Sequence, residues 1–322
     1  MAASPPPVAA ADPAFRADVL AGLAAPIPAI PARWLYDRRG SELFEAITDL
    51  PEYYLTRTER ALLERHSPDV AHLAGTGDAV VEFGSGSSAK TPILLRAVAP
   101  SAYVPIDISG NFLRDSSAAL QKDFPELPIY PVEGDFMKPI VLPPEVAQET
   151  KLGFFPGSTI GNMVARTSVD LLRAMKDTLG VGAFLLIGMD RLKDVDTLIR
   201  AYDDAQGVTA AFNMNLLHRI NAELNGDIPL DAFRHRAIWN DRMARIEMHL
   251  EAVRNVAFAV EGQSFAFKAG ETIHTENSHK YGLRDSRLLL RAAGWGLCRE
   301  WTDEDDQFAL ILAEAEAPRF AP

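Results

Sequence analysis

Cysteine is almost absent from this chain, because Cys298 is the only one among its 322 residues. A single cysteine excludes an intramolecular disulfide and a cysteine-based zinc site, and it suits a reducing compartment. The seven histidines are scattered and show no spacing typical of metal ligands. His249, His274 and His279 are expected to be surface or structural residues. We therefore expect a cytoplasmic protein that holds no metal.

Positive charge and long apolar runs are also scarce. The chain has 32 Lys and Arg against 44 Asp and Glu, which gives a net charge of −12. Such an acidic surface repels phosphate backbones, so no nucleic-acid partner is expected. No apolar run reaches the length of a membrane span, and the N-terminus lacks the basic region of a signal peptide, so no membrane partner is expected. Residues 1–13, rich in proline and alanine, are predicted to form a disordered tail.

Apolar residues, in contrast, make up 48% of the chain, which is enough for one large or two medium domains. Between residues 79 and 190, short apolar runs alternate with helical patterns. The predicted strands are 79–83, 103–107, 129–132, 152–155 and 183–190, and the predicted helices are 90–98, 112–123 and 168–178. This alternation predicts an α/β fold with a parallel, doubly wound sheet that binds ligands at the C-terminal ends of its strands.

The segments around this α/β region have different patterns. Residues 14–61 are helical and rich in aromatics, 196–236 have a helical pattern, and 243–267 alternate with a period of two, which predicts antiparallel strands. A helix at about 284–293 and a β-hairpin close the chain. We predict two domains. The sheet domain comprises 62–195 plus 284–322, and a second α+β lobe comprises 14–61 plus 196–283.

The glycine loop after the first predicted strand indicates a nucleotide site. A strand, a glycine turn and a helix present backbone N–H groups to a nucleotide. Gly84-x-Gly86-x-x-Ala89, with Asp107 about twenty residues further on, fits the fingerprint of NAD-binding proteins. Glu82 ends the strand, where a carboxylate suits the cationic sulfonium and amino groups of S-adenosylmethionine (SAM) better than a pyrophosphate. SAM is favoured, while an NAD-dependent oxidoreductase and a non-catalytic SAM-binding protein stay open.

Several longer blocks carry a resemblance to a known family. They are Tyr36-Asp37 with Gly40-Ser41-x-Leu43-Phe44, Leu50-Pro51-Glu52-Tyr53-Tyr54, Phe155-Pro156-Gly157-Ser158-Thr159-Ile160-Gly161-Asn162, and Thr275-Glu276-x-Ser278. Over nearly its whole length the chain resembles the ergothioneine-pathway histidine Nα-methyltransferases, SAM-dependent enzymes that place three methyl groups on the α-amine of L-histidine. The resemblance implies a Rossmann-like class I SAM-methyltransferase sheet with a substrate-binding lobe. It also implies SAM as cofactor, L-histidine as the small-molecule substrate and hercynine as product.

The resemblance also implies roles for the residues around the glycine loop. Gly84 and its neighbours would hold the methionine part of SAM, with Lys90 just after them. Asp107 would take the ribose hydroxyls, and Asp135 and Phe136 the adenine. The expected cofactor-binding residues are Glu82, Gly84, Ser85, Gly86, Lys90, Asp107, Asp135 and Phe136.

For the acceptor, the resemblance implies that Tyr36 and Tyr53 face the amine as catalytic residues. Asn162 and Tyr202 would hold the substrate carboxylate and amine. The amine must lose a proton before it attacks, and tyrosine is a weak base near neutral pH, so orientation is expected to dominate over general-base catalysis. Without the resemblance, these tyrosines have an alternative interpretation as core or interface aromatics.

The same resemblance implies that Glu276 and Ser278 grip the two imidazole nitrogens, with Met248 lining the pocket. The expected substrate-binding residues are thus Tyr53, Asn162, Tyr202, Met248, Glu276 and Ser278. An alternative for Glu276 is a simple ion pair with Lys280 four residues on. Another amino acid, or an imidazole-containing amine, stays open as the acceptor because polar Asn277 lies inside this block. The oligomeric state is left open, with a monomer as the working expectation.

Overall fold

A computed structural model describes residues 12–86 and 88–317. The predicted tail lies outside these residues except for its last two. Asp12 caps helix α1 (Pro13–Ala24) by accepting a hydrogen bond from the Ala14 amide at 2.8 Å. The chain forms two compact units. Unit 1 comprises the residues up to Glu52, Val195–Asn240 and Ile246–Asn277, and unit 2 comprises Tyr53–Asp194, Asp241–Arg245 and the residues from Ser278 onward.

Unit 2 is built on a seven-stranded sheet with the order β11-β12-β5-β4-β1-β2-β3. Its strands are β1 (Ala79–Phe83), β2 (Tyr103–Asp107), β3 (Val132–Glu133), β4 (Lys151–Phe155), β5 (Phe184–Asp190), β11 (Trp295–Thr302) and β12 (Phe308–Ala315). The first five strands are parallel, and β12 is inserted antiparallel between β5 and β11. Both the doubly wound sheet and the closing hairpin were predicted and are confirmed.

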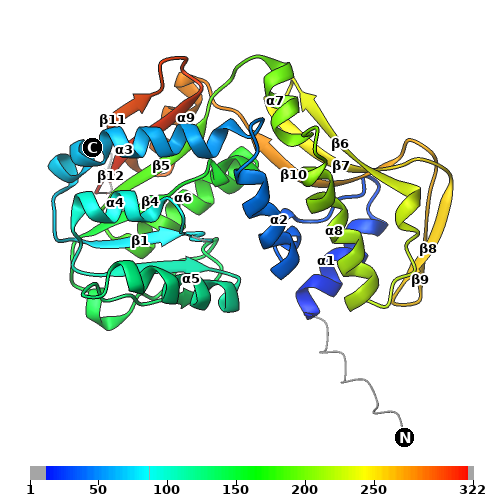
Figure 1. Cartoon of the computed structure of the whole chain (residues 1–322), viewed down its shortest axis with the longest axis horizontal. Coiled ribbons are helices and arrows are strands. Elements are labelled where there is room, and N and C mark those ends of the chain that lie inside the picture. The colour runs from blue at the N-terminus through cyan, green and yellow to red at the C-terminus, as the bar shows by residue number, and fades with distance from the viewer. Residues whose placement is uncertain (1–11, 87, 318–322) are drawn as a thin grey trace, which may run out of the picture. The chain divides into compact units, whose positions relative to one another are not determined.

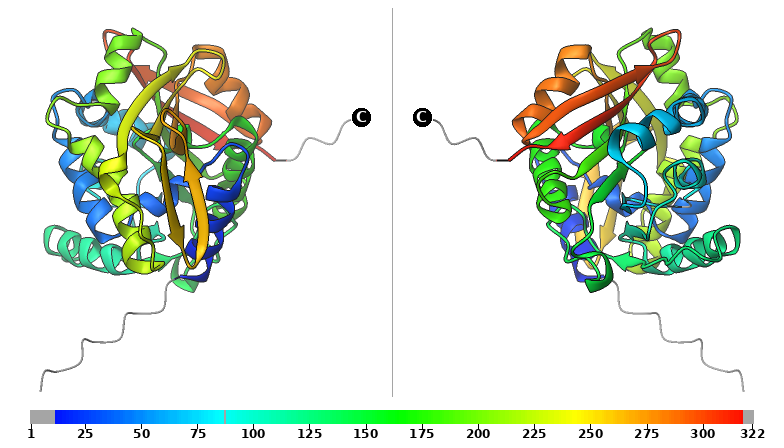
Figure 2. Two further views of the ribbon diagram at one scale, coloured as in Figure 1. Left: turned by 90° about the vertical axis from the view of Figure 1, so that its right-hand side faces the viewer. Right: turned by 90° about the vertical axis from the view of Figure 1, so that its left-hand side faces the viewer.

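Helices cover both faces of this sheet. One face carries α3 (Tyr54–Ala74), α4 (Thr91–Val98) and α5 (Gly110–Asp123), and the other carries α6 (Ala165–Leu179) and α9 (Leu283–Ala292) (Figures 1 and 2). Strands β1 and β4 are consequently buried along their whole lengths. This is why their sequences are continuous apolar runs rather than alternating patterns.

Unit 1 combines helices with two small sheets. Its helices are α1, α2 (Arg38–Thr48), α7 (Val195–Tyr202) and α8 (Val208–Glu223), and α2 packs against α8. A three-stranded sheet has the order β10-β7-β6, and β8 pairs with β9 as a hairpin. These strands are β6 (Phe233–Asn240), β7 (Arg245–Ala252), β8 (Val256–Val260), β9 (Gln263–Phe267) and β10 (Thr272–His279). The strands predicted for 243–267 are confirmed, and β8 and β9 are antiparallel as expected.

Three expectations about the elements need correction. The helical prediction for 196–236 is wrong at its end, because α8 stops at Glu223 and β6 begins at Phe233. The predicted strand 129–132 is displaced to β3, because Pro131 has no N–H to donate to a strand ladder. The boundary that we placed between residues 61 and 62 falls within α3, which is one continuous helix of unit 2 packed on α4 and β12.

Among the helices that the structure describes, none combines the length and the apolar character that crossing a bilayer would need.

Candidate functional site

The loop after β1 turns sharply, and its glycines make the turn possible. Gly84 and Gly86 have φ of +69° and +50°, which L side chains rarely adopt. The amides of Gly84 and Ser85 both donate to the Ile106 carbonyl, at 2.8 and 3.2 Å. A Cβ on Gly84 would lie 3.4 Å from the ring of Phe136. The loop therefore passes close to that ring and is tied to the end of β2.

Two of the predicted carboxylates follow the neighbouring strands at the same edge of the sheet. Asp107 ends β2, and it accepts hydrogen bonds from the amides of Gly86 at 3.0 Å and Ser109 at 2.9 Å. Asp135 follows β3 and accepts from the Met137 amide at 3.0 Å. The C-terminal edge of a doubly wound sheet is where such folds bind ligands. The structure thus brings Gly84–Gly86, Asp107, Asp135 and Phe136 together within unit 2.

Lys90 has a buried partner that sequence reasoning missed. Its ammonium group pairs with the carboxylate of Glu59, which is fully buried in α3. The same carboxylate accepts from the Gly157 amide at 2.9 Å. Glu59 thereby connects the glycine loop to the segment that leads to Asn162. Its position in the sequence gives no signal of this burial, because a glutamate between Thr58 and Arg60 resembles an exposed helical residue.

Glu82, which we expect to lie beside a bound cation, has partners within the protein. The side chain is buried, and its Oε2 atom accepts hydrogen bonds from Thr91 at 2.7 Å and from the hydroxyl of Tyr103. Burial raises the pKa of Glu82 from 4.5 to about 7, against the opposing effect of those hydrogen bonds. Glu82 therefore links β1 to β2 and α4 through two protein hydroxyls.

This raised pKa predicts a stability that falls with rising pH. The folded chain binds the Glu82 proton more tightly than the unfolded chain, so this stabilisation is complete below pH 4.5 and is lost as pH rises to about 7. A pKa raised from 4.5 to about 7 corresponds to a stabilisation of about 3 kcal/mol. Glu82→Gln should remove this pH dependence while it keeps an acceptor for Thr91. Urea unfolding at pH 5 and pH 8 measures the free energy of unfolding of the wild type and of Glu82→Gln. An equal change between the two pH values in both proteins would contradict the prediction.

In unit 1 the structure brings two of the predicted acceptor residues into contact. The hydroxyl of Tyr36 donates to Oε1 of Glu276 at 3.2 Å, and Glu276 is buried in β10. The ring of Tyr36 packs edge-on against Phe44 and Phe212, at 5.5 and 5.4 Å between centroids. Sequence reasoning missed Phe212, which lies in α8, far from both partners along the chain.

The other two predicted residues of unit 1, Tyr202 and Met248, are both buried. Tyr202 is buried at the last position of α7, and its carbonyl accepts a hydrogen bond from His235 at 2.8 Å. Met248 is buried in β7, the strand next to β10. The structure thus places Met248 and Glu276 on neighbouring strands, and Tyr202 on a helix of the same unit.

Three predicted acceptor residues belong to unit 2. Tyr53 is the buried residue that precedes α3, and Asn162 ends the short 3-10 helix Thr159–Asn162 after β4. Ser278 accepts a hydrogen bond from Lys280 at 2.9 Å. Lys280 forms its ion pair with Asp190 at 2.7 Å and lies beyond a strand, so the helical pairing that we considered between Glu276 and Lys280 is wrong.

One cluster in the described part of the chain combines residue types that bind metals. Ligand atoms of Glu247, His249 and His274 lie within 4.8 Å of one another. His249 contacts Glu247 and Thr272 through its two ring nitrogens, at 3.1 Å each. The rings of His249 and His274 stack nearly parallel at 4.7 Å, so their nitrogens do not converge at the roughly 2 Å that a shared ion needs. Hydrogen bonding and stacking account for this cluster.

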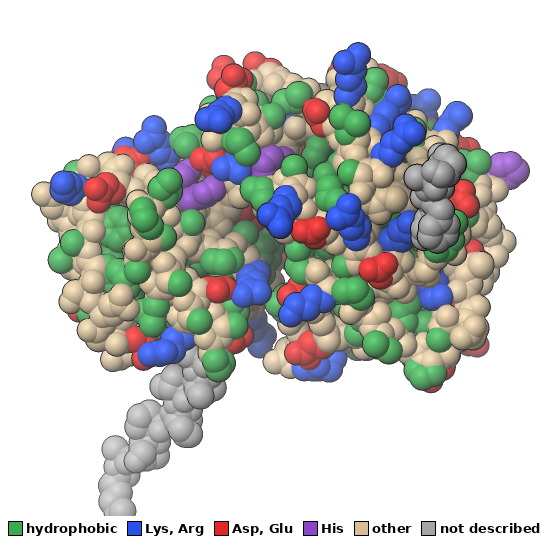
Figure 3. All heavy atoms as spheres, turned by 180° about the vertical axis from the view of Figure 1, so that it is seen from behind, with side chains coloured by type: hydrophobic (Ala, Val, Ile, Leu, Met, Phe, Trp, Pro, Cys, Tyr) green, Lys and Arg blue, Asp and Glu red, His purple; other side chains and the backbone are tan. Residues whose placement is uncertain are grey.

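A basic groove on the α6 and α9 side of unit 2 lies away from the candidate residues. Lys and Arg side chains gather there (Figure 3), and Arg173, Lys176 and Arg291 line the groove. Arg173 donates to the Ala292 carbonyl at 3.0 Å, and Lys176 to the Gly294 carbonyl at 3.2 Å. Cations at the C-terminal end of a helix complement its dipole, so this groove has a structural explanation.

The strand order, the antiparallel β12, the glycine loop after β1 and the acids Asp107 at the end of β2 and Asp135 after β3 define a class I SAM-dependent methyltransferase. The sequence profile of a family described as "Histidine-specific methyltransferase, SAM-dependent" matches residues 15–315. The chain belongs to this family. NAD, the alternative cofactor, is therefore set aside in favour of SAM.

Similarity to curated proteins extends over nearly the whole chain. It is 42% identical to a histidine N-alpha-methyltransferase of Mycolicibacterium smegmatis, and 41% identical to one of Mycobacterium tuberculosis. Both matches cover 93% of this chain and 94% of the relative. A 29% identical match to ergothioneine biosynthesis protein 1 of Neurospora crassa covers 89% of this chain and 33% of that protein.

Proposed function

We propose that this chain transfers three methyl groups, one after another, from SAM to the α-amine of L-histidine. The product is Nα,Nα,Nα-trimethylhistidine, or hercynine, and the reaction is the first step of ergothioneine biosynthesis. Membership of the family supports the donor and the reaction. The buried Glu276 carboxylate, already in contact with the Tyr36 hydroxyl, carries the proposal for histidine, because it is an acceptor for an imidazole N–H.

The proposed donor site lies in unit 2, and the residues there fit SAM. The carboxylate of Asp107 accepts two backbone hydrogen bonds and keeps lone pairs for two ribose hydroxyls. The Phe136 ring beside Gly84 provides an apolar face for adenine, with Asp135 next to it. Lys90, and the amides of the turn at Gly84–Gly86, would hold the methionine part. When bound, SAM supplies an electrophilic methyl group.

The proposed acceptor residues have complementary tasks. Glu276 and Ser278 would bind the two ring nitrogens of the imidazole, and Met248 would line the pocket. Asn162 and Tyr202 would hold the carboxylate and the amine. A buried polar pair that a substrate leaves unpaired costs about 1–3 kcal/mol, so these residues would select histidine over an apolar amino acid.

For the transfer itself, the chain has mainly to orient a neutral amine. Tyr36 donates its hydroxyl proton to Glu276, and because a phenol oxygen is also an acceptor, Tyr36 would accept a hydrogen bond from the amine. Tyr53 would be the second hydroxyl facing the amine. Holding the reactants in line can contribute about 7–11 kcal/mol. Neither tyrosine is a strong base near neutral pH, so each would direct the departing proton to water.

Mass spectrometry of L-histidine incubated with SAM and the pure protein tests the proposal. We expect products heavier by one, two and three methyl groups, with the trimethylated form accumulating last. A parallel panel of amino acids, tryptophan and tyrosine included, serves as the control for the acceptor. Methylation of another amino acid in preference to histidine would show that the reaction is right and the acceptor wrong.

A further inference from the structure

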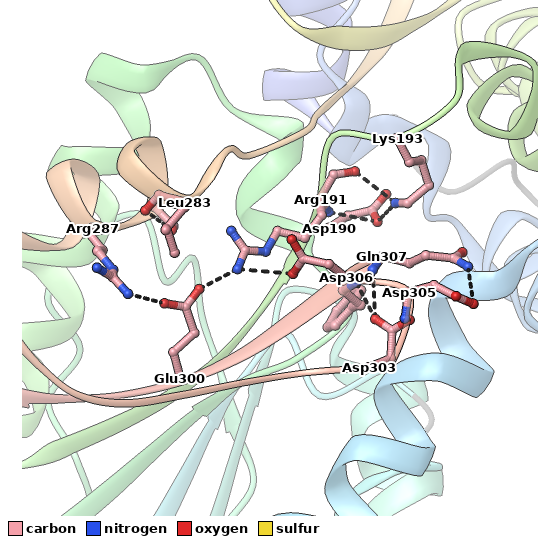
Figure 4. Close-up of polar contacts among 12 residues, drawn as sticks. Asp190, Arg191, Lys193, Leu283, Arg287, Glu300, Asp303, Asp305, Asp306 and Gln307 are labelled. Atoms are coloured by element: carbon pink, nitrogen blue, oxygen red, sulfur yellow. Dashed lines mark hydrogen bonds and ion pairs between the residues drawn. The ribbon is translucent and has the colours of Figure 1, made fainter.

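A buried cluster of charged residues contacts Ser278, one of the two residues proposed to bind the imidazole. Asp190 ends β5 and is completely buried. Its carboxylate accepts from the Tyr54 hydroxyl at 2.7 Å and pairs with Lys193 at 2.5 Å and Lys280 at 2.7 Å. Figure 4 shows Asp190 and Lys193 beside the separate ion pair of Arg191. All of these residues belong to unit 2.

The pairing of Asp190 with two lysines is costly and calls for an explanation. The side chain of Lys280 has no exposed surface, and that of Lys193 is 9% exposed. Removing such charges from water costs free energy that their mutual attraction often does not repay, so a buried ion pair is weak evidence for stability. Burial raises the pKa of the Asp190 carboxyl, but the neighbouring Lys280 and Lys193 outweigh that effect and lower it overall. The carboxylate is therefore ionised and holds the Lys280 ammonium in place.

Lys280 also contacts Ser278. Its ammonium group donates to the Ser278 hydroxyl oxygen at 2.9 Å. An ammonium group has three donors and no acceptor, while a hydroxyl has a single proton. Ser278 is thus the acceptor in this contact whatever the rotation of its hydroxyl, and its own proton points away from Lys280.

We infer that the Asp190–Lys280 pair positions Ser278 for the substrate, because the ammonium group that Asp190 holds in turn bonds the Ser278 oxygen, which would contact one ring nitrogen of the imidazole. The inference rests on the proposed function. Glu276 and Ser278 are two residues apart in β10, so their side chains point to the same face of the strand.

Lys280→Met tests this, with Lys193→Met as the matched control. Both substitutions remove one ammonium group from the same carboxylate, but Lys280 donates to Ser278 while Lys193 donates to the Tyr54 hydroxyl. In calorimetry with S-adenosylhomocysteine present, we expect Lys280→Met to weaken L-histidine binding about tenfold, the value of one hydrogen bond of roughly 1.4 kcal/mol. Lys193→Met should change it less than about twofold. Equal losses in the two variants would overturn the inference.

A double-mutant cycle with Ser278→Ala distinguishes positioning from a general structural role. If Lys280 acts through Ser278, adding Lys280→Met to Ser278→Ala should weaken histidine binding little further. Additive losses would overturn the inference. Thermal unfolding and S-adenosylhomocysteine binding show whether each variant is folded. If Lys280→Met unfolds, the cycle is repeated with Lys280→Gln, because the glutamine amide can still bond Asp190. A wild-type protein that does not bind histidine would instead refute the proposed function.

Discussion

Glu276→Ala should weaken the binding of L-histidine about 100-fold and leave the binding of S-adenosylhomocysteine unchanged. The carboxylate is buried in β10 and accepts the Tyr36 hydroxyl. Hydrogen bonds to charged groups contribute about 1.5–3 kcal/mol each, and the truncation also leaves the Tyr36 hydroxyl without this acceptor. Calorimetric titrations of both ligands into the purified variant measure the two affinities separately.

Two further variants make this result interpretable. Glu271→Ala removes an exposed glutamate just before β10 and should leave both affinities at their wild-type values. Tyr36→Phe removes only the hydroxyl that donates to Glu276 and should weaken histidine binding less than Glu276→Ala does. Equal losses of histidine and S-adenosylhomocysteine affinity in Glu276→Ala would mean that Glu276 is structural.

Asp107→Ala should weaken S-adenosylhomocysteine binding by about 100-fold or more. The carboxylate has two tasks at once, because it ties down the amides of Gly86 and Ser109 and is the proposed partner of the ribose hydroxyls. Its loss removes hydrogen bonds to a charged acceptor, each of about 1.5–3 kcal/mol, and loosens the turn that has to approach the ligand closely.

Calorimetry with S-adenosylhomocysteine measures this second effect. Asp115→Ala, which removes an exposed acid from α5 of the same unit, is the matched control and should bind like the wild type. Thermal unfolding of both variants reports whether the fold is retained. Wild-type affinity in a folded Asp107→Ala protein would show that Asp107 lies outside the cofactor site.

Local patterns in the sequence were strong enough to predict most of unit 2. The fully apolar runs that became β1 and β4 can be buried only in a sheet covered on both faces, and each ends in a turn that glycine or proline marks. Where a local signal was weak, the prediction failed. Strand β6 alternates exposed Arg234 with buried Phe233 and Ala237 over only a few residues directly after a helix, and a short pattern of that kind is ambiguous.

Contacts between distant segments could not be predicted in this way. Glu59 meets Lys90 and Gly157, and Asp190 meets Lys280, across 31 to 98 residues of chain. Each charged partner alone resembles an ordinary surface charge of an acidic protein. Burial and pairing are properties of the packed state, because they depend on which side chains the tertiary structure brings within hydrogen-bond distance.

The sequence by itself determined the α/β class, the glycine loop with its carboxylates and the likeness to histidine methyltransferases, because these depend on periodicity and on residues close together along the chain. Only the tertiary structure decided that Glu82 bonds two protein hydroxyls, that Tyr36 contacts Glu276, and that Asp190 pairs with Lys280. The reason is physical. A hydrogen bond requires two atoms within about 3 Å, and folding alone sets that distance for residues far apart in the chain.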